Sequence, residues 1–212
     1  MSLLFYESPV LTASVLAATA ISAYIDWSIY LTGFILLLFL FLLYFYRYEK
    51  YNGPSAQNNE ILCPCEGTVL KIYKHDPNYL YIAVFLSPFN RHTQIYPVNG
   101  TVIKRQYDHS GRFEIVMDLD KSKYNEKNMH YIIMKNKTLI KMTQIAGFLP
   151  RMITSSNITP LDVTAGDYLG MMKFGSRVDM LLPWKDTNGR YLYLNADEHQ
   201  ELSIGDLLAW YE

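Results

Sequence analysis

One dipeptide in the chain pairs a hydroxyl nucleophile with a backbone that can bend toward it, namely Gly175 followed by Ser176. Glycine has no Cβ, so it adopts unusual dihedral angles and allows close approach at its carbonyl. If the backbone is strained here, the Ser176 Oγ can attack the preceding peptide bond. A Gly-Ser pair is more often only part of a turn, so the dipeptide alone leaves both interpretations open.

Other common signatures of chemistry are missing from the sequence. It contains no glycine-rich phosphate loop, no H-E-x-x-H zinc motif and no G-x-S-x-G nucleophile elbow. Cys63 and Cys65 are too close in an extended chain to form an undistorted disulfide, and no second cysteine pair is present to complete a zinc site. We therefore expect free thiols and no metal.

Composition narrows the classes of partner. The chain has 212 residues, with 19 Lys and Arg against 20 Asp and Glu, and no dense basic run. Nucleic-acid phosphates need a clustered basic face, so we exclude nucleic-acid binding. A hydrophobic content of 50% with 18% charged residues also excludes disordered and collagen-like classes.

The N-terminal region carries the strongest compositional signal. Residues 27–46 read WSIYLTGFILLLFLFLLYFY, without a charge and with the length of one bilayer-spanning helix. Residues 9–25 are a weaker apolar segment. We predict a membrane anchor over residues 1–50, formed by a helical hairpin of 9–25 and 27–46 or by one span with an interfacial first segment. Arg47 and Lys50 follow the stronger segment and place the rest of the chain on the cytoplasmic face.

The remainder of the chain has a different pattern. Residues 51–59 are polar and rich in structure breakers, which is typical of a linker. After them, short runs rich in Val, Ile, Tyr and Leu predict strands at residues 68–73, 79–86, 100–104, 112–117, 130–134 and 138–145. No long helical period competes with these runs, so we predict that residues 60–212 form a mainly β domain, a compact β-sandwich or barrel-like hybrid.

A phrase occurs twice within this domain. Residues 64–71 read PCEGTVLK and residues 97–104 read PVNGTVIK. In both, a glycine suited to a tight bend precedes a β-branched run. The echo suggests two similar hairpin units packed against each other, and chance recurrence of a common turn-strand phrase is the alternative.

Several segments together resemble the phosphatidylserine decarboxylase family, in particular its short forms with an N-terminal membrane hairpin. The matching phrases occur in family order over residues 60 to about 183. They are Pro64-Cys-Glu-Gly67, Phe85-Leu-Ser-Pro-Phe-Asn-Arg-His92, Pro97-Val-Asn-Gly100, Asn125-Glu-Lys-Asn128, Gln144-Ile-Ala-Gly147 and Lys173-Phe-Gly-Ser-Arg-Val-Asp179.

The resemblance implies a proenzyme that cuts itself between Gly175 and Ser176. In the family, the serine oxygen attacks the glycine carbonyl to give an ester, and β-elimination followed by hydrolysis with loss of ammonia leaves a pyruvoyl group. Ser176 is thus the implied precursor of the cofactor, which forms a Schiff base with the serine amine of the lipid. The products would be a β chain of residues 1–175 and an α chain of residues 176–212, held together non-covalently.

The resemblance also assigns roles to other residues. His92 occupies the position of the family's motif histidine, and it is our candidate for acid–base work because imidazole titrates near physiological pH. Glu66 stands where the family has aspartate, and we expect it to orient His92. Ile95 occupies the place of a second histidine that some members carry. The implied reaction converts phosphatidylserine, or a related serine phospholipid, to phosphatidylethanolamine at a membrane, and a homodimer is left open.

Arg151 is a further candidate, for binding substrate. It follows the apolar residues 148–150, and its guanidinium can pair with a lipid phosphate, although a buried hydrophobic turn is an equally good interpretation.

Two alternatives to the decarboxylase remain at this stage. Because Glu66 is one methylene longer than aspartate, the chain can be a membrane-anchored lipid-binding relative that no longer processes itself. A structural protein on a membrane stalk is suggested only by the repeated phrase.

Overall fold

The computed structural model describes residues 9–24, 29–109, 112–147, 153–155, 158–173 and 175–212. The chain divides into two compact units, Met1–Glu49 and Lys50–Glu212. The first holds α2 (Pro9–Tyr24) and α3 (Ile29–Phe45), which contact each other, so both predicted helical segments are helices. None of the helices in the described ranges is both long and apolar enough to cross a membrane.

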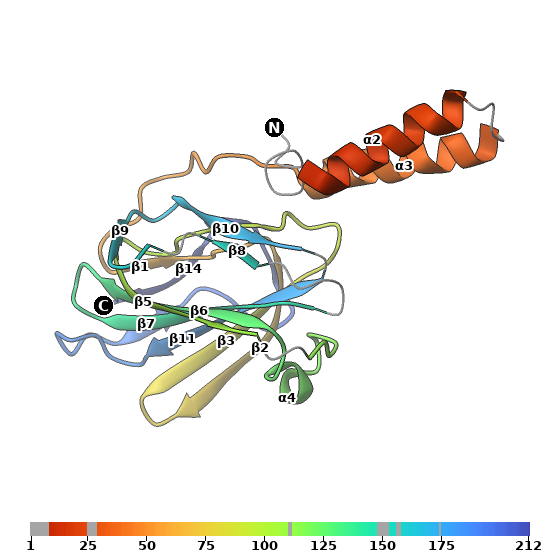
Figure 1. Cartoon of the computed structure of the whole chain (residues 1–212). Coiled ribbons are helices and arrows are strands. Elements are labelled where there is room, and N and C mark those ends of the chain that lie inside the picture. Colours follow the sequence, from red (N-terminus) through yellow and green to blue (C-terminus); the bar gives the residue numbers. More distant parts are fainter. Residues whose placement is uncertain (1–8, 25–28, 110–111, 148–152, 156–157, 174) are drawn as a thin grey trace. The chain divides into compact units, whose positions relative to one another are not determined.

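The second unit is built on one large antiparallel sheet (Figure 1). Its eight strands run in the order β13-β2-β3-β11-β7-β6-β5-β9. Their bounds are β2 (Gly67–Asp76), β3 (Tyr79–Leu86), β5 (Gly100–Asp108), β6 (Lys127–Met134), β7 (Leu139–Ile145), β9 (Leu161–Val163), β11 (Ser176–Pro183) and β13 (Glu201–Leu202).

Two smaller sheets complete the unit. One has the order β1-β14-β12 and the other β4-β10-β8. Their strands are β1 (Glu60–Leu62), β4 (Thr93–Ile95), β8 (Ile153–Ser155), β10 (Tyr168–Met172), β12 (Leu192–Leu194) and β14 (Leu207–Tyr211). A short helix, α4 (Leu119–Ser122), lies between β5 and β6 in the sequence. A large hydrophobic cluster draws residues from all three sheets or the segments joining them, among them Val69, Val84, Val102, Ile132, Met180 and Leu208.

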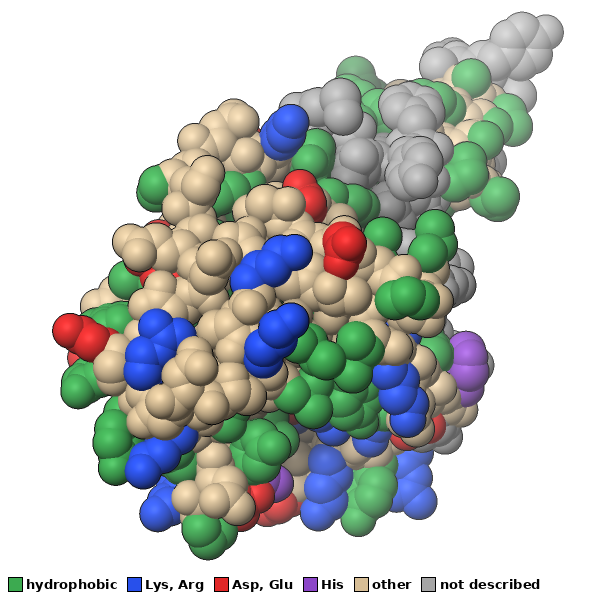
Figure 2. All heavy atoms as spheres, turned by 90° about the vertical axis from the view of Figure 1, so that its left-hand side faces the viewer, with side chains coloured by type: hydrophobic (Ala, Val, Ile, Leu, Met, Phe, Trp, Pro, Cys, Tyr) green, Lys and Arg blue, Asp and Glu red, His purple; other side chains and the backbone are tan. Residues whose placement is uncertain are grey.

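The prediction of a mainly β domain is confirmed. The barrel-like description is not, because the described strands form no closed barrel and β13 and β9 are the two edges of the large sheet. Charged side chains are spread out: on the face in Figure 2, Lys and Arg lie interspersed with hydrophobic and neutral groups and do not gather into one basic patch.

Most of the predicted strands are present, but the strand expected at residues 112–117 is wrong. Its backbone bonds to a side chain and not to a neighbouring strand: Glu114 N donates to Asn125 Oδ1 at 2.8 Å, and Asn125 Nδ2 donates to Glu114 O at 2.7 Å. Arg112 forms only an isolated bridge with Asn125. Asn125 therefore fixes this segment as a loop.

The repeated phrase has a structural counterpart. Gly67 begins the β2–β3 hairpin and Gly100 begins the β5–β6 hairpin. The stretches that lead into the hairpins bond to each other reciprocally, because Leu62 N donates to Pro97 O at 2.8 Å and Ile95 N donates to Pro64 O at 2.9 Å. The two units are thus packed together at equivalent positions.

Candidate active site

Ser176 is the first residue of β11, a strand with neighbours on both sides. It pairs with Leu86, the last residue of β3, while Arg177 pairs with Ile145, the last residue of β7. Paired and alternate residues of a sheet share a face. The Ser176 side chain is therefore at one end of the sheet, on the face that Val178 also occupies.

The environment of the Ser176 hydroxyl is unusual for a polar group. Its Oγ is buried and has no hydrogen-bond partner among the described residues. An unsatisfied buried hydroxyl costs about 1–3 kcal/mol, so it calls for an explanation. Gly175 has φ 58°, in the left-handed region, and a Cβ placed there would meet no heavy atom within 4 Å. Glycine is thus needed at position 175 because of the backbone conformation, and not because a side chain would lack room. A group derived from Ser176 would be buried at this end of the sheet.

His92 is linked to the Ser176 segment at two points. The His92 carbonyl accepts from Met172 N at 3.0 Å, at the end of the strand that leads to Gly175. On the other side, the strand β3 that pairs with Ser176 continues through a tight turn, in which Asn90 N donates to Ser87 O at 3.0 Å, directly into His92. The predicted partners therefore lie at the same end of the sheet.

The hydrogen bond of the His92 ring defines its tautomer. His92 is fully buried, and its Nδ1 lies 2.9 Å from the carbonyl oxygen of Asn90. A carbonyl oxygen can only accept, so Nδ1 carries the proton and Nε2 has the lone pair when the ring is neutral. Nε2 is accordingly the atom suited to take up a proton.

Glu66 supports the turn before His92. Its carboxylate accepts from Asn90 Nδ2 at 3.2 Å and from Arg91 Nε at 2.6 Å. Asn90 is also the residue whose carbonyl fixes the His92 ring. These bonds connect Glu66 to the backbone that positions His92.

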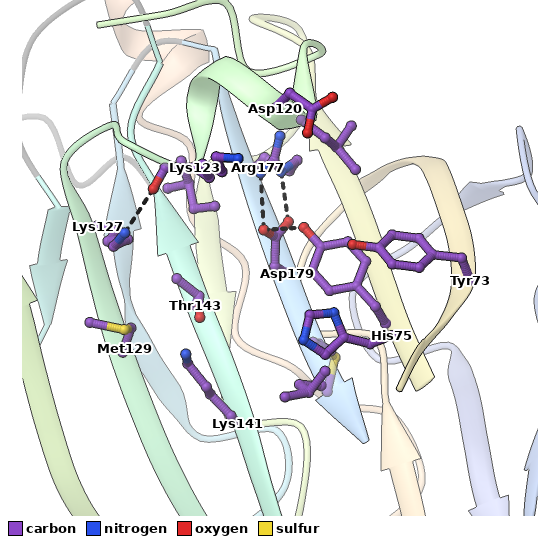
Figure 3. A pocket seen from close by; sticks show the side chains of 15 residues that line it. Tyr73, His75, Asp120, Lys123, Lys127, Met129, Lys141, Thr143, Arg177 and Asp179 are labelled. Carbon is purple, nitrogen blue, oxygen red and sulfur yellow. Dashed lines mark hydrogen bonds and ion pairs between the residues drawn. The ribbon is translucent and has the colours of Figure 1, made fainter. Parts of the chain in front are cut away.

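On the opposite face of β11, Arg177 and Asp179 form a buried ion pair (Figure 3). Arg177 donates to both carboxylate oxygens, at 2.6 and 3.0 Å, and through Nη1 to Ser122 Oγ at 2.6 Å. Burial lowers the pKa of Arg177, but Asp179 and Tyr81 together raise it by more, so the net change is upward. Tyr81 donates its hydroxyl to Asp179, and burial raises the pKa of that phenol. These contacts fix the start of β11.

The same face carries a cavity of about 370 Å³, which includes Tyr73, His75, Lys127, Lys141 and the Arg177–Asp179 pair in its lining. Because adjacent side chains of a strand point to opposite faces, this cavity is not on the Ser176 side of β11.

Sequence reasoning missed three buried polar side chains on the Ser176 side. Gln94, His130 and Gln144 are all fully buried, and they bond to one another and to the His92 carbonyl. Gln144 lay in a matched phrase without an assigned role, and the short strand around Gln94 gave no signal. Arg151 lies outside the described residues.

The described residues contain no group of His, Cys, Asp or Glu that could hold a metal ion. Cys63 and Cys65 are buried free thiols, with Cys63 Sγ bonded to Cys65 O at 3.1 Å. Burial raises the pKa of Cys65 well above its ordinary value. Both cysteines therefore behave as parts of the core.

Comparison with known proteins gives a consistent result. Residues 38–209 match the family model described as phosphatidylserine decarboxylase. The chain is 37% identical to a phosphatidylserine decarboxylase proenzyme of Prosthecochloris aestuarii, over 70% of this chain and 69% of that one. It is 35% identical to the proenzymes of Chlorobium limicola (71% and 72% covered) and Cytophaga hutchinsonii (70% and 69% covered). No solved structure gives a significant match. The extent of these matches shows that the chain belongs to the phosphatidylserine decarboxylase family of enzymes.

Proposed function

We propose that the chain is a proenzyme that cuts itself between Gly175 and Ser176 and then decarboxylates phosphatidylserine to phosphatidylethanolamine. The observation that carries this proposal is the buried Ser176 Oγ, which has no hydrogen-bond partner among the described residues and directly follows a glycine at φ 58°. The nucleophile and the bond it attacks are thus at the buried N-terminal end of a strand that is paired on both sides.

Cleavage begins with attack of Ser176 Oγ on the Gly175 carbonyl carbon. The hydroxyl proton must leave as the new bond forms, and His92 Nε2 is the basic atom that we assign to this step. The Arg177–Asp179 pair holds the next residues, so the attacking group is delivered from a rigid strand. The bond between the Gly175 carbonyl carbon and the Ser176 nitrogen then breaks to give an ester, and β-elimination releases the Gly175 carboxylate and leaves dehydroalanine at position 176. Hydrolysis of the dehydroalanine by water, with loss of ammonia, gives the pyruvoyl group.

The two chains stay associated after the cut in this proposal. Residues 176–212 contribute β11, which lies between β3 and β7, together with β13 beside β2 and β14 beside β1. Each of these pairings joins the two products by a backbone hydrogen-bond ladder. The apolar side chains Val178, Met180 and Leu208 belong to the common core and add hydrophobic stabilisation.

The pyruvoyl group supplies an electron-withdrawing carbonyl for loss of carbon dioxide from an amino acid headgroup. The chain's own residues then bind, orient and protonate. His92 remains beside the Ser176 segment and is the candidate for returning a proton to the reacting carbon. Burial of His92 and Ser176 keeps water from this end of the sheet.

We also propose that the N-terminal unit holds the enzyme at the lipid surface, with the catalytic unit on the cytoplasmic side. Large apolar side chains of α3, including Phe34, Leu37 and Leu40, are exposed. Such surface is costly in water and is stabilised by lipid. A diacyl substrate leaves the bilayer at a cost of about 0.8 kcal/mol per exposed CH₂, so an enzyme held at the membrane meets it directly.

The test uses the full chain, purified in detergent and mixed with phosphatidylserine labelled in the serine carboxyl. We expect labelled carbon dioxide and phosphatidylethanolamine from the wild type and neither from Ser176→Ala. Binding of phosphatidylserine by an uncut wild-type chain, without release of carbon dioxide, would contradict the proposal and favour the processing-deficient relative.

Glu66 is the specific reason to keep that second candidate. Its side chain is one methylene longer than the aspartate of the family phrase, and misplacement by about 1 Å near a reacting centre can be costly. If the wild type stays whole and Glu66→Asp becomes fully cleaved, impairment at this position is established.

A further inference from the structure

A line of hydrogen bonds runs from β5, the strand next to one edge of the large sheet, to the backbone of His92, and all but its first bond are buried. Arg105 Nε donates to His130 Nδ1 at 3.2 Å, and His130 Nε2 lies 2.9 Å from Gln144 Oε1. Gln144 Nε2 then donates to Gln94 Oε1 at 2.9 Å, and Gln94 Nε2 donates to the His92 carbonyl. We call Gln94, Gln144 and His130 the glutamine–histidine chain.

The direction of every hydrogen bond in the glutamine–histidine chain follows from Arg105, which donates to His130. An arginine side chain only donates, so His130 Nδ1 must accept, and a neutral ring then carries its proton on Nε2. Gln144 must therefore present its oxygen to His130 and its amide hydrogens to Gln94. The same reasoning turns Gln94 so that its NH₂ group faces the His92 carbonyl. No member can reverse without placing two acceptors or two donors against each other.

The glutamine–histidine chain lies on the face of the large sheet that carries Ser176. Gln144 pairs with Val178 on β11, and Val178 is on the same face as Ser176. On the other side, Gln144 pairs with Asn128 of β6, and His130 is two residues further along the same face. Arg177 and Asp179 point to the opposite face. The charged or titratable side chains bonded along this line are His130, its donor Arg105, and Tyr96, whose hydroxyl accepts from Arg105 Nη2 at 2.5 Å.

We propose that the glutamine–histidine chain positions His92 for the reaction, as a set of positioning residues that do not touch the substrate. The inference rests on the proposed role of His92. The Asn90 carbonyl fixes the His92 ring through Nδ1, and Gln94 fixes the His92 carbonyl, which also accepts from Met172 N. The ring is therefore held from both its side chain and its main chain.

The substitution Gln144→Glu tests the direction of the bonds with an almost unchanged shape. A protonated carboxyl can accept from His130 and donate to Gln94, as the amide does. An ionised carboxylate cannot donate, so Gln94 must turn its NH₂ group toward position 144 and present oxygen to the His92 carbonyl. Burial raises the pKa of such a carboxyl. The activity of Gln144→Glu relative to wild type should thus fall as pH rises.

The experiment uses full-length cleaved enzyme in detergent between pH 5.5 and 8.5. For Gln144→Glu we expect kcat to be at least about tenfold below wild type at pH 8.5, with recovery toward acid pH and little change in KM, because misplacement of a catalytic group lowers kcat. Gln144→Met, which removes both bonds at every pH, should show a loss that acid does not restore. Gln106→Glu places the same charge at an exposed position of β5 and should match wild type.

A second measurement is independent of catalysis. In the uncleaved Ser176→Ala chain, ¹⁵N NMR of the histidine rings should show His130 neutral with its proton on Nε2, and Gln144→Glu should shift the His92 ring signals. The proposal is overturned if His130 carries its proton on Nδ1, or if Gln144→Glu keeps wild-type kcat at every pH. It is also overturned if both Gln144 variants lose kcat equally at all pH values. An inactive wild type with the expected His130 tautomer would instead reject the proposed function and leave the bond direction confirmed.

Discussion

The hairpins β2–β3 and β5–β6 begin with the same sequence phrase, yet the residue before the glycine makes different hydrogen bonds in each. In the first, Glu66 accepts hydrogen bonds from Asn90 and Arg91, which lead into His92. In the second, Asn99 donates to Ala56 O at 2.7 Å and accepts from Ala165 N at 2.9 Å. One side chain supports the candidate active site, and the other fastens two loops.

This difference shows that the shared phrase encodes the backbone of a hairpin and not its chemistry. The glycine and the β-branched residues are equivalent in both units. Only the first unit has a charged residue before its glycine, and that residue, Glu66, contacts the turn that leads to His92. The predictions below compare the two units position by position.

The largest expected difference is between Glu66→Ala and Asn99→Ala. Loss of Glu66 releases the Asn90–Arg91 turn, and a shift of about 1 Å at His92 should lower cleavage and decarboxylation rates by about 100-fold. Loss of Asn99 should leave kcat unchanged but lower the free energy of unfolding by about 1–3 kcal/mol, since two backbone groups lose their partner. Rate assays and urea denaturation of both variants distinguish the effects, and equal effects on kcat would show that the comparison is wrong.

The second prediction compares a buried and an exposed histidine. Burial, followed by Arg105, lowers the pKa of His130 on β6 to about 4, although its bond to Gln144 raises it. The unfolded chain therefore binds a proton at higher pH than the folded one, so stability present above about pH 6.5 is lost as pH falls toward 4. The loss from this residue is about 3 kcal/mol.

Urea denaturation at several pH values measures this loss. His130→Gln should flatten the acid limb of the stability curve, whereas His75→Gln, at an exposed position of β2, should leave the curve as in wild type. Parallel curves for wild type and His130→Gln would contradict the assignment of a neutral, buried ring.

The third prediction is that replacing Gly67 or Gly100 by alanine lowers stability to a similar extent. A Cβ on Gly67 would lie 2.1 Å from Phe85 O, and one on Gly100 would lie 2.2 Å from Ile133 O. Both contacts are with strand backbone, which must shift, so we expect Gly67→Ala and Gly100→Ala each to lower stability by about 1–3 kcal/mol. Thermal unfolding of the two variants tests this, and tolerance of either alanine would break the structural equivalence.

The smallest effects should come from the lysines that end the two phrases. Lys71 is 3.6 Å from Glu198, and Lys104 lies over the ring of Tyr131. Both are exposed, so Lys71→Ala and Lys104→Ala should change the free energy of unfolding by less than about 0.5–1 kcal/mol. A change of several kcal/mol in either would mean that its contact is less solvated than the structure indicates.

Much of the large sheet could be predicted from the sequence because its long strands are rich in Val, Ile, Leu and Tyr and are separated by segments that contain Pro, Gly, Asn or Asp. The residues of β3 were predicted with the bounds that the structure has. Strands of two or three residues, such as β4 and β13, carry no measurable period, and they exist because distant segments pair with them. Residues 112–117 have strand-like composition, but the Asn125 side chain satisfies the backbone of Glu114 instead.

The site was predictable in part for a similar reason. Gly175, Ser176 and His92 belong to local phrases, and the structure brings their segments together at one end of the sheet. The glutamine–histidine chain depends on contacts between residues that are far apart in sequence, such as Gln94 with Gln144. No local pattern carries that information, and only the register of the strands shows it.

The most direct test of the central claim is the intact mass of the purified full-length chain, measured beside Ser176→Ala. We predict that the wild type yields two chains, residues 1–175 and 176–212, the second without a free amino terminus and reactive toward a carbonyl reagent, while Ser176→Ala stays whole. A wild-type chain that remains intact and lacks a carbonyl-reactive group would contradict the account.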